Sequence, residues 1–428
     1  MADAALPDAS SLAEQEAEYD RFVRENLRAN YIAHFSHGML GMTGFRIMMA
    51  PTFLPAYLFM LTGSNFLVGL GQALTQLGAV LSPIMSASNI EYRKRVLPVA
   101  IRIGTAMRLA ILGLALTGYF LTGSLLLFAT FGCLFLLGFF MGQQRVAFQM
   151  LLSKVIPIEK RGRLQAWRNM AGGGTAALLS YFAGAWFLEQ NVLGNGYATT
   201  FLVCFILTSL GLFVLFRYMR EPEPPTVRPR MSVRERLRDF PELLGDRDYR
   251  NVLIAQLLTV AARISLPFCI LYAADTIELD GAAIGLLTLA FLGADTLANL
   301  AWGYIGDRSG YRLTFIFSVI VWLAALVLLI VADSALPIYL AFVGLGASMS
   351  GYMMSASTII LEFGSRDDLP MRLALSTTAE TSVATVGPLA GGVIAATLGY
   401  IPLFFISIGF LIAALTILLL FVREPRNR

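Results

Sequence analysis

Residues 313–331 read LTFIFSVIVWLAALVLLIV and carry no charged side chain. As a helix, an apolar run of about 20 residues crosses the roughly 30 Å hydrocarbon core of a lipid bilayer. The whole chain has this character, because its 428 residues are 57% hydrophobic and 14% charged and its mean hydropathy is +0.69. These values exclude a soluble domain and predict an all-α polytopic membrane protein.

Further apolar stretches on both sides of this one bring the number of predicted transmembrane helices to twelve. They cover residues 32–61, 67–87, 97–120, 124–152, 164–188, 197–217, 250–274, 282–303, 312–331, 335–361, 371–398 and 401–422. The loops 62–66, 121–124, 189–196, 275–281, 332–334 and 399–400 contain no Lys or Arg, whereas the loops on the other side are rich in both. Since basic residues concentrate in cytoplasmic loops, we expect a multi-pass protein of the cytoplasmic (inner) membrane with both termini cytoplasmic.

The longest polar interruption, residues 219–248, divides the predicted helices into two sets of six. We therefore expect a cytoplasmic amphipathic segment (1–30), an N-terminal six-helix bundle (31–218), a cytoplasmic linker (219–248), a C-terminal six-helix bundle (249–422) and a cytoplasmic tail (423–428). The two sets share a sequence pattern, because Arg46 precedes Pro51 in the first helix of one set and Arg263 precedes Pro267 in the first helix of the other. This shared pattern supports an internal repeat.

Three loop and helix motifs point to a family. The segment 303–312, GYIGDRSGYR, resembles the G-x-x-x-D-R-x-G-x-R loop signature of the major facilitator superfamily. Residues 157–163 are similar to a cytoplasmic turn of that family, and the glycine-rich segment 387–392 is similar to its eleventh span. The resemblance covers roughly residues 31–422. It implies two pseudo-symmetric six-helix bundles and secondary active transport by alternating access.

The same resemblance implies a gating loop made of Asp307, Arg308 and Arg312. The alternative is that Asp307 pairs with the two arginines and only shapes a tight turn. The corresponding loop of the first half, residues 86–95, departs from the signature because its acidic residue is displaced to Glu91. The gating prediction is therefore confined to the second-half loop.

Charged residues inside the predicted spans are the main functional clue, because each costs roughly 2.5–3.5 kcal/mol near the bilayer centre on insertion scales. They are Arg46, Arg102, Arg108, Arg145, Arg263, Asp295 and Glu380. With more cations than carboxylates at this depth, some arginines must face a watery cavity or an anionic ligand. Arg102 lies about one turn inside its span and is expected to extend to the interface, while Arg108 is expected to be a structural or gating cation.

Arg46 and Arg263 are the strongest substrate-binding candidates. The resemblance places their helices along a central cavity, and a guanidinium offers a planar fork of donors that matches a carboxylate or phosphate. The alternative is structural pairing, in which Arg263 pairs with Asp295 and Arg46 pairs with Glu380. The two carboxylates are themselves candidates for proton coupling, since a desolvated carboxyl group can carry a proton.

Other polar residues complete the predicted cavity. Arg145 and Gln149 share one helix face, as do Gln72 and Gln76, and Tyr352 lies on a polar face of its span. Their alternative roles are extension of Arg145 to the interface and hydrogen bonding between helices by the others.

The two histidines of the chain, His34 and His37, are followed by several methionines. Imidazole and thioether groups could hold a transition metal, although a methionine-rich helix is more often adaptable packing. The metal interpretation is therefore an alternative, and no metal site is predicted.

The sequence contains none of the motifs HExxH, GxSxG or Walker A, so we expect a transporter that is not an enzyme and has no cofactor. The expected partners are a small-molecule substrate, namely an anion or an anionic organic compound, the lipid bilayer and a coupling proton. No nucleic-acid partner is expected, and the protein is expected to be a monomer. The alternatives are efflux of drugs or cationic amphiphiles, transport of a transition metal or chelate, and a non-transporting scaffold or receptor.

 The excess of arginines over carboxylates inside the spans favours a small anion or an anionic organic compound as the substrate.

Overall fold

The computed structural model describes residues 9–90, 93–225, 244–360 and 369–422, and the regular secondary structure in these ranges is helical. The helices are α1 (Ala9–Glu25), α2 (Leu27–Met48), α3 (Phe53–Thr62), α4 (Asn65–Ile90), α5 (Leu97–Phe120), α6 (Gly123–Val155), α7 (Ile158–Phe182), η1 (Ala183–Leu188), η2 (Val192–Gly194), α8 (Gly196–Tyr218), α11 (Arg247–Ala262), η3 (Arg263–Phe268), α12 (Cys269–Ala273), α13 (Gly281–Ser309), α14 (Tyr311–Ile330), α15 (Ala335–Ile359), α16 (Leu369–Thr397) and α17 (Tyr400–Leu420).

Within the described residues, nine helical segments are long and apolar enough to cross a membrane. The three more polar helices α4, α7 and α16 bring the total to the twelve that the sequence predicts. Their polarity has a structural reason, because α4 packs against α16 and α7 packs against α13 of the other half. The prediction of a twelve-helix, all-α membrane protein is confirmed.

The first helix of each half is broken, which corrects the continuous spans predicted for residues 32–61 and 250–274. In the first half, α2 ends at Met48 and α3 begins at Phe53, with Pro51 between them. In the second half, α11 ends at Ala262 and is followed by the 3-10 segment η3, which contains Pro267. Proline lacks an N–H group and its ring clashes with the preceding helical turn, so both breaks follow from the sequence.

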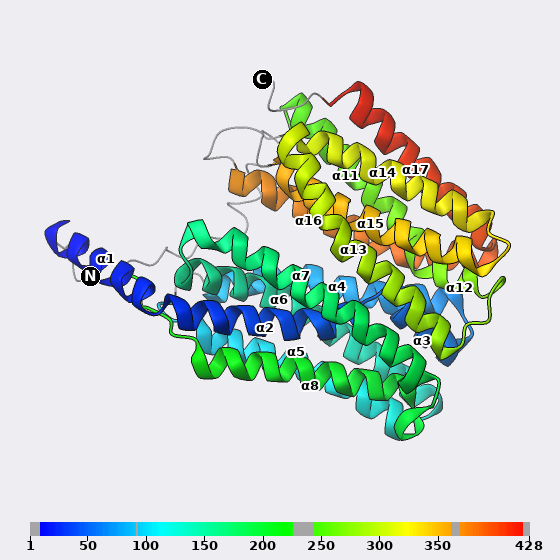
Figure 1. Ribbon diagram of the computed structural model, residues 1–428, viewed down its shortest axis with the longest axis horizontal. Helices are drawn as coiled ribbons and strands as arrows, with labels where there is room; N and C mark the ends of the chain where they lie inside the picture. The colour runs from blue at the N-terminus through cyan, green and yellow to red at the C-terminus, as the bar shows by residue number, and fades with distance from the viewer. Residues whose placement is uncertain (1–8, 91–92, 226–243, 361–368, 423–428) are drawn as a thin grey trace.

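Helices α2–α8 form one bundle and α11–α17 form the other, drawn from blue to green and from light green to red in Figure 1. In the first bundle α2 packs against α7 and α8, and α6 packs against α4 and α5. In the second bundle α15 packs against α13 and α14, and α11 packs against α17. The bundles meet near α3 and α12 and diverge toward the end that carries both termini (Figure 1).

Close backbone contacts join the two bundles at the end opposite the termini. A Cβ atom on Gly184 would lie 2.3 Å from the carbonyl oxygen of Gly281 and 2.4 Å from the Cα atom of Gly285. The hydroxyl groups of Thr52 and Thr288 are 2.6 Å apart and hydrogen-bonded across the same interface. Only glycine fits at position 184 while the halves are this close.

The two ends of the first bundle are tied to each other. The side-chain amide of Asn30, near the start of α2, donates to the carbonyl oxygen of Arg220 at 2.9 Å. The backbone N–H of Arg220, just beyond α8, donates to Asn30 Oδ1 at 2.8 Å. Asn30 is fully buried, so this paired contact is shielded from water.

Candidate functional site

An ion pair between Arg46 and Asp295 joins the two bundles in the middle of the molecule. Arg46 lies in the last turn of α2, and its Nη1 atom donates to Asp295 Oδ2 on α13 and, at 3.4 Å, to the hydroxyl group of Thr296. The two paired side chains are 21% and 15% exposed. Gly173 of α7 packs on this group, because a Cβ atom there would lie 3.0 Å from Arg46 Nη1. Three helices from both halves therefore meet at the pair.

A second charged group lies within the second bundle. Tyr352 of α15 is fully buried, and its hydroxyl group donates to Glu380 Oε1 of α16 at 3.0 Å. Arg263, at the break between α11 and η3, is close enough to interact electrostatically with both residues. Among the described residues, however, Arg263 forms no ion pair within 4.0 Å and donates no hydrogen bond. Its donors are therefore available to a ligand.

Arg145 approaches the second group from the opposite bundle. Arg145 and Gln149 are exposed on α6, yet the charge of Arg145 interacts with Glu380 on α16. An exposed side chain that interacts with the other bundle faces the space between the bundles. Gln72 and Gln76 of α4 are half-buried, and no contact in the described part of the chain joins them to this group.

The charges in this central region do not balance. Arg46, Arg145 and Arg263 contribute three positive charges, whereas Asp295 and Glu380 contribute at most two negative charges. An unpaired charge away from bulk water is unfavourable unless a counter-ion or water compensates it. The region is therefore suited to an anion.

The structural pairing considered for the two arginines had the wrong partners. Arg46, and not Arg263, pairs with Asp295, and Arg263, and not Arg46, lies near Glu380. Both helices contact the first bundle, α13 through α7 and α16 through α4, but α16 also packs against α11 and η3, the segments between which Arg263 lies. Asp295 therefore reaches across to the first half, and Glu380 meets the arginine of its own half.

Gln256 was not identified from the sequence, although it supports the second group. This fully buried residue of α11 donates to the carbonyl oxygen of Ala356 at 2.8 Å and accepts from Ser376 at 2.9 Å. It thereby links α11, α15 and α16, the helices that carry Arg263, Tyr352 and Glu380. Its signal in the sequence was a single glutamine in an otherwise apolar run.

Asp307 and Arg308 of the loop motif form local contacts, and Arg312 contacts α17. Asp307 accepts from the Tyr311 hydroxyl at 3.0 Å, and Arg308 donates to the Tyr304 hydroxyl at 2.9 Å. Arg312 donates to the carbonyl oxygens of Leu418 at 2.9 Å and Leu419 at 3.2 Å. Arg312 thus satisfies carbonyl groups at the C-terminal end of α17, where a positive charge is also favoured by the helix dipole. Glu91 lies outside the described residues. The gating role stays a prediction.

His34 and His37 do not form a suitable metal site. The His37 ring stacks on Phe148 at 4.4 Å between centroids, and the four imidazole nitrogens are buried without a hydrogen-bond partner among the described residues. The positive charges of Arg108 and Arg168 act on this pair. In the same described part of the chain, no group of three His, Cys, Asp or Glu side chains gathers. Two nearby guanidinium groups and the lack of a carboxylate disfavour a divalent cation.

The two remaining arginines of the predicted spans differ in their surroundings. Arg102 is exposed on α5. Arg108 is 2% exposed and donates to the carbonyl oxygens of Thr208 and Gly104, each at 2.7 Å. Arg108 therefore links α5 to α8.

Comparisons with known proteins agree with this architecture. Residues 252–428 match the family model described as Major Facilitator Superfamily. The chain is 29% identical over 185 residues to the multidrug resistance protein MdtG of Serratia proteamaculans, an alignment that covers 41% of this chain and only 44% of that relative.

Solved structures resemble the fold over nearly the whole chain. The D-xylose-proton symporter aligns with a TM-score of 0.73 and 13% identity, covering 94% of this chain and 99% of that one. A variant of the nucleoside transporter NupG aligns with a TM-score of 0.71 and 12% identity, covering 92% of this chain and 100% of that one. The second half of the chain thus matches the family model of the Major Facilitator Superfamily, the whole chain shares its fold with these solved transporters, and the chain is a multi-pass membrane protein.

Proposed function

We propose that the protein is a secondary active transporter, not an enzyme, and that it carries a small anionic solute across the cytoplasmic membrane by alternating access. The observation that carries this proposal is the state of Arg263. Its guanidinium lies at a helix break near Glu380 and has no hydrogen-bond acceptor among the described residues. A planar guanidinium with free donors binds carboxylate or phosphate groups through two parallel hydrogen bonds.

The solute would contact both bundles. Arg263 belongs to the second bundle and Arg145 to the first, and both interact with Glu380. An anion between the two arginines is attracted from both sides, so its binding favours the approach of the bundles. Arg46 is already paired with Asp295, and it becomes a ligand only when that pair opens.

Alternating access is supported by where the bundles touch. The described residues of the first bundle that form hydrogen bonds with described residues of the second are Arg46, Thr52, Asn65 and Glu189. They lie between the central ion pair and the end of the molecule opposite the termini. The bundles diverge toward the other end (Figure 1). Because the basic loops assign the terminal end to the cytoplasm, this arrangement corresponds to a state open to the cytoplasm.

Drug export is a second candidate function, and the similarity to a multidrug resistance protein favours it. In that case Glu380 would attract a cationic amphiphile. Glu380 also carries the proposal of proton coupling, because its partner Tyr352 can donate to the ionised carboxylate or accept from the protonated one.

The test is ligand-induced thermal stabilisation of the purified protein. The anionic probes are inorganic phosphate, sugar phosphates and dicarboxylates, and the cationic probe is tetraphenylphosphonium. We expect an anion to stabilise the wild type saturably and the variants Arg263→Gln and Arg145→Gln weakly or not at all. Arg102→Gln is the matched control, since Arg102 is exposed on α5.

Flux of the stabilising anion into proteoliposomes then separates a transporter from a binding protein. Stabilisation by tetraphenylphosphonium alone, with loss of the effect in Glu380→Gln, would replace the anion proposal with drug export. Binding without flux would contradict transport itself.

A further inference from the structure

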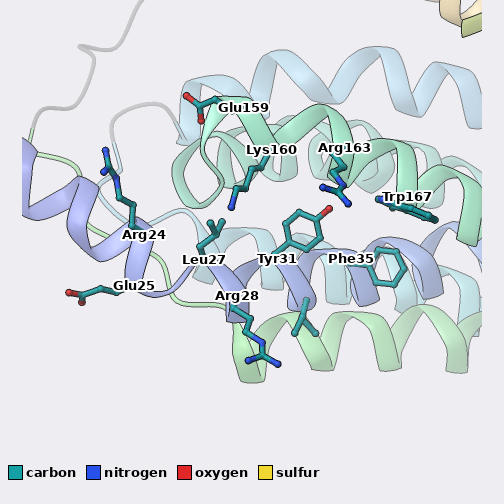
Figure 2. Close-up of a pocket in the computed structure, with 11 residues that line it drawn as sticks. Arg24, Glu25, Leu27, Arg28, Tyr31, Phe35, Glu159, Lys160, Arg163 and Trp167 are labelled. Carbon is teal, nitrogen blue, oxygen red and sulfur yellow. The ribbon is translucent and has the colours of Figure 1, made fainter. Parts of the chain in front are cut away.

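A cavity of about 930 Å³ lies at the terminal end of the first bundle, far from the central arginines. Its walls come from the junction of α1 and α2 on one side and from the first turns of α7 on the other (Figure 2). Four basic residues line it, namely Arg24, Arg28, Lys160 and Arg163. They occupy two different parts of the chain that the fold brings together.

The four basic groups of this cavity form no ion pair with the part of the chain that the structure describes. All four side chains are exposed, and none forms an ion pair within 4.0 Å with a described residue. Figure 2 shows Lys160 and Arg163 reaching from α7 toward Tyr31, whereas the carboxylates of Glu25 and Glu159 point away from them. The cavity therefore presents an uncompensated positive charge, which suits a phosphate group.

The remaining walls are apolar and aromatic, with Tyr31, Phe35 and Trp167 among them. Trp167 begins an exposed stripe on α7, because Trp167, Met170, Leu178 and Phe182 are 47%, 40%, 62% and 56% exposed and recur at helical spacing. Exposed apolar side chains along a membrane-crossing helix face lipid. A different face of α7 carries Gly173, which packs against the other bundle.

The cavity thus combines a basic end with an apolar exit that continues along the bilayer. Tryptophan and tyrosine are enriched where headgroups meet hydrocarbon, and basic pockets between helices on the cytoplasmic side bind acidic lipid headgroups. We propose that this cavity binds an anionic phospholipid. Its phosphate lies beside Lys160 and Arg163, with Arg24 and Arg28 adding positive charge at the rim, and its acyl chains follow the α7 stripe.

A bound lipid would hold α1 against α7. Helix α1 already touches the bundle through Tyr19, whose hydroxyl group donates to the carbonyl oxygen of Lys154 at 2.9 Å. Arg24 and Arg28 lie on either side of the junction between α1 and α2, so a lipid phosphate held by Lys160 and Arg163 also attracts the positive charges of this junction. This inference does not depend on what the protein transports.

The experiment measures lipid binding by the full-length protein in phosphatidylcholine nanodiscs, with phosphatidylglycerol added stepwise. The readouts are thermal stabilisation and retention of lipid in native mass spectrometry. We expect saturable stabilisation by phosphatidylglycerol, and an affinity about tenfold or more lower in the double variant Lys160→Gln/Arg163→Gln. The matched control is Arg217→Gln/Arg250→Gln, which removes two exposed basic residues at the same end of the molecule but outside the cavity.

Two further arms separate the possible sources of phosphate. Trp167→Ala should weaken phosphatidylglycerol binding severalfold, since it removes the wall against which the acyl chains pack. Glycerol 1-phosphate, which has the headgroup chemistry without the chains, should stabilise the protein far less than the lipid does. Equal loss in the control double variant, or equal stabilisation by glycerol 1-phosphate, would overturn the proposal of a lipid site.

Discussion

Arg46 and Arg263 occupy matching places in the two bundles, and the structure uses them differently. Each lies at the break of the first helix of its half. Arg46 forms an ion pair with Asp295 of the other bundle, whereas Arg263 stays within its own bundle beside Glu380 and Tyr352. A repeated element therefore links the two halves in one copy and stays within its own half in the other, where we propose that it binds the solute.

The largest expected effect comes from separating the bundles. Gly184→Val places side-chain atoms where the backbone of Gly281 and Gly285 now lies, and no rotamer relieves a clash with backbone. The variant should break the Arg46–Asp295 pair while leaving the Arg263 group intact, and transport should fall at least about tenfold. Solute flux and pulsed EPR distances between the bundles measure these effects.

Gly174→Val is the control for that variant, because a Cβ atom at position 174 meets nothing within 4 Å. If both variants transport normally, close contact at the end opposite the termini is not required for the transport cycle.

The second largest effect tests whether Arg263 differs in role from Arg46. Arg263→Gln removes a charged donor that has no protein acceptor among the described residues, so the loss should fall on ligand binding. Hydrogen bonds to charged groups contribute about 1.5–3 kcal/mol, which corresponds to roughly a 10- to 150-fold weaker Kd. Thermal stability without ligand should change little, as differential scanning fluorimetry can show. A large loss of stability with unchanged Kd would make Arg263 structural.

Asp295→Asn should show the opposite pattern. It leaves the Arg46 guanidinium without its counter-ion, which should lower the free energy of unfolding by about 1–2 kcal/mol, less than for a fully buried pair because both side chains are partly exposed. The double variant Arg46→Gln/Asp295→Asn should recover much of this loss. Thermal or chemical denaturation of the four proteins gives the coupling free energy, and additive effects would show that the pair contributes nothing.

The smallest effect is expected from Tyr352→Phe, which removes one hydrogen bond to Glu380. The ligand Kd should rise about two- to tenfold, since Glu380 then turns more freely toward Arg263 and competes with the anion. Isothermal titration calorimetry measures the change. Tyr352→Phe with a tighter Kd than the wild type would reverse the assigned role of Glu380.

The fold was largely predictable from the sequence, because length and apolarity define most spans and the prolines mark the helix breaks. Pro51 and Pro267 were visible beside the two arginines, yet the spans around them were predicted as continuous. The close contacts at Gly184 were not predictable, since they depend on how α7 and α13 approach each other.

The charged residues inside the membrane spans were predictable, but their pairing was not. Arg46, Arg263, Asp295 and Glu380 can be identified from the sequence alone, because each is a charged residue inside an apolar stretch. Which carboxylate meets which arginine depends on the packing of α13 and α16, which lie far from α2 in the sequence. Gln256 was overlooked because a single buried amide has no periodic signal.

The paired hydrogen bonds between Asn30 and Arg220 have a consequence for biosynthesis. They join residues that are 190 positions apart, and they close the first bundle with contacts drawn from that bundle and its immediate C-terminal extension. Domains generally fold as units during translation, starting from the N-terminus. The first bundle can therefore complete its own closure while the second is still being synthesised, so that the second inserts against a finished partner.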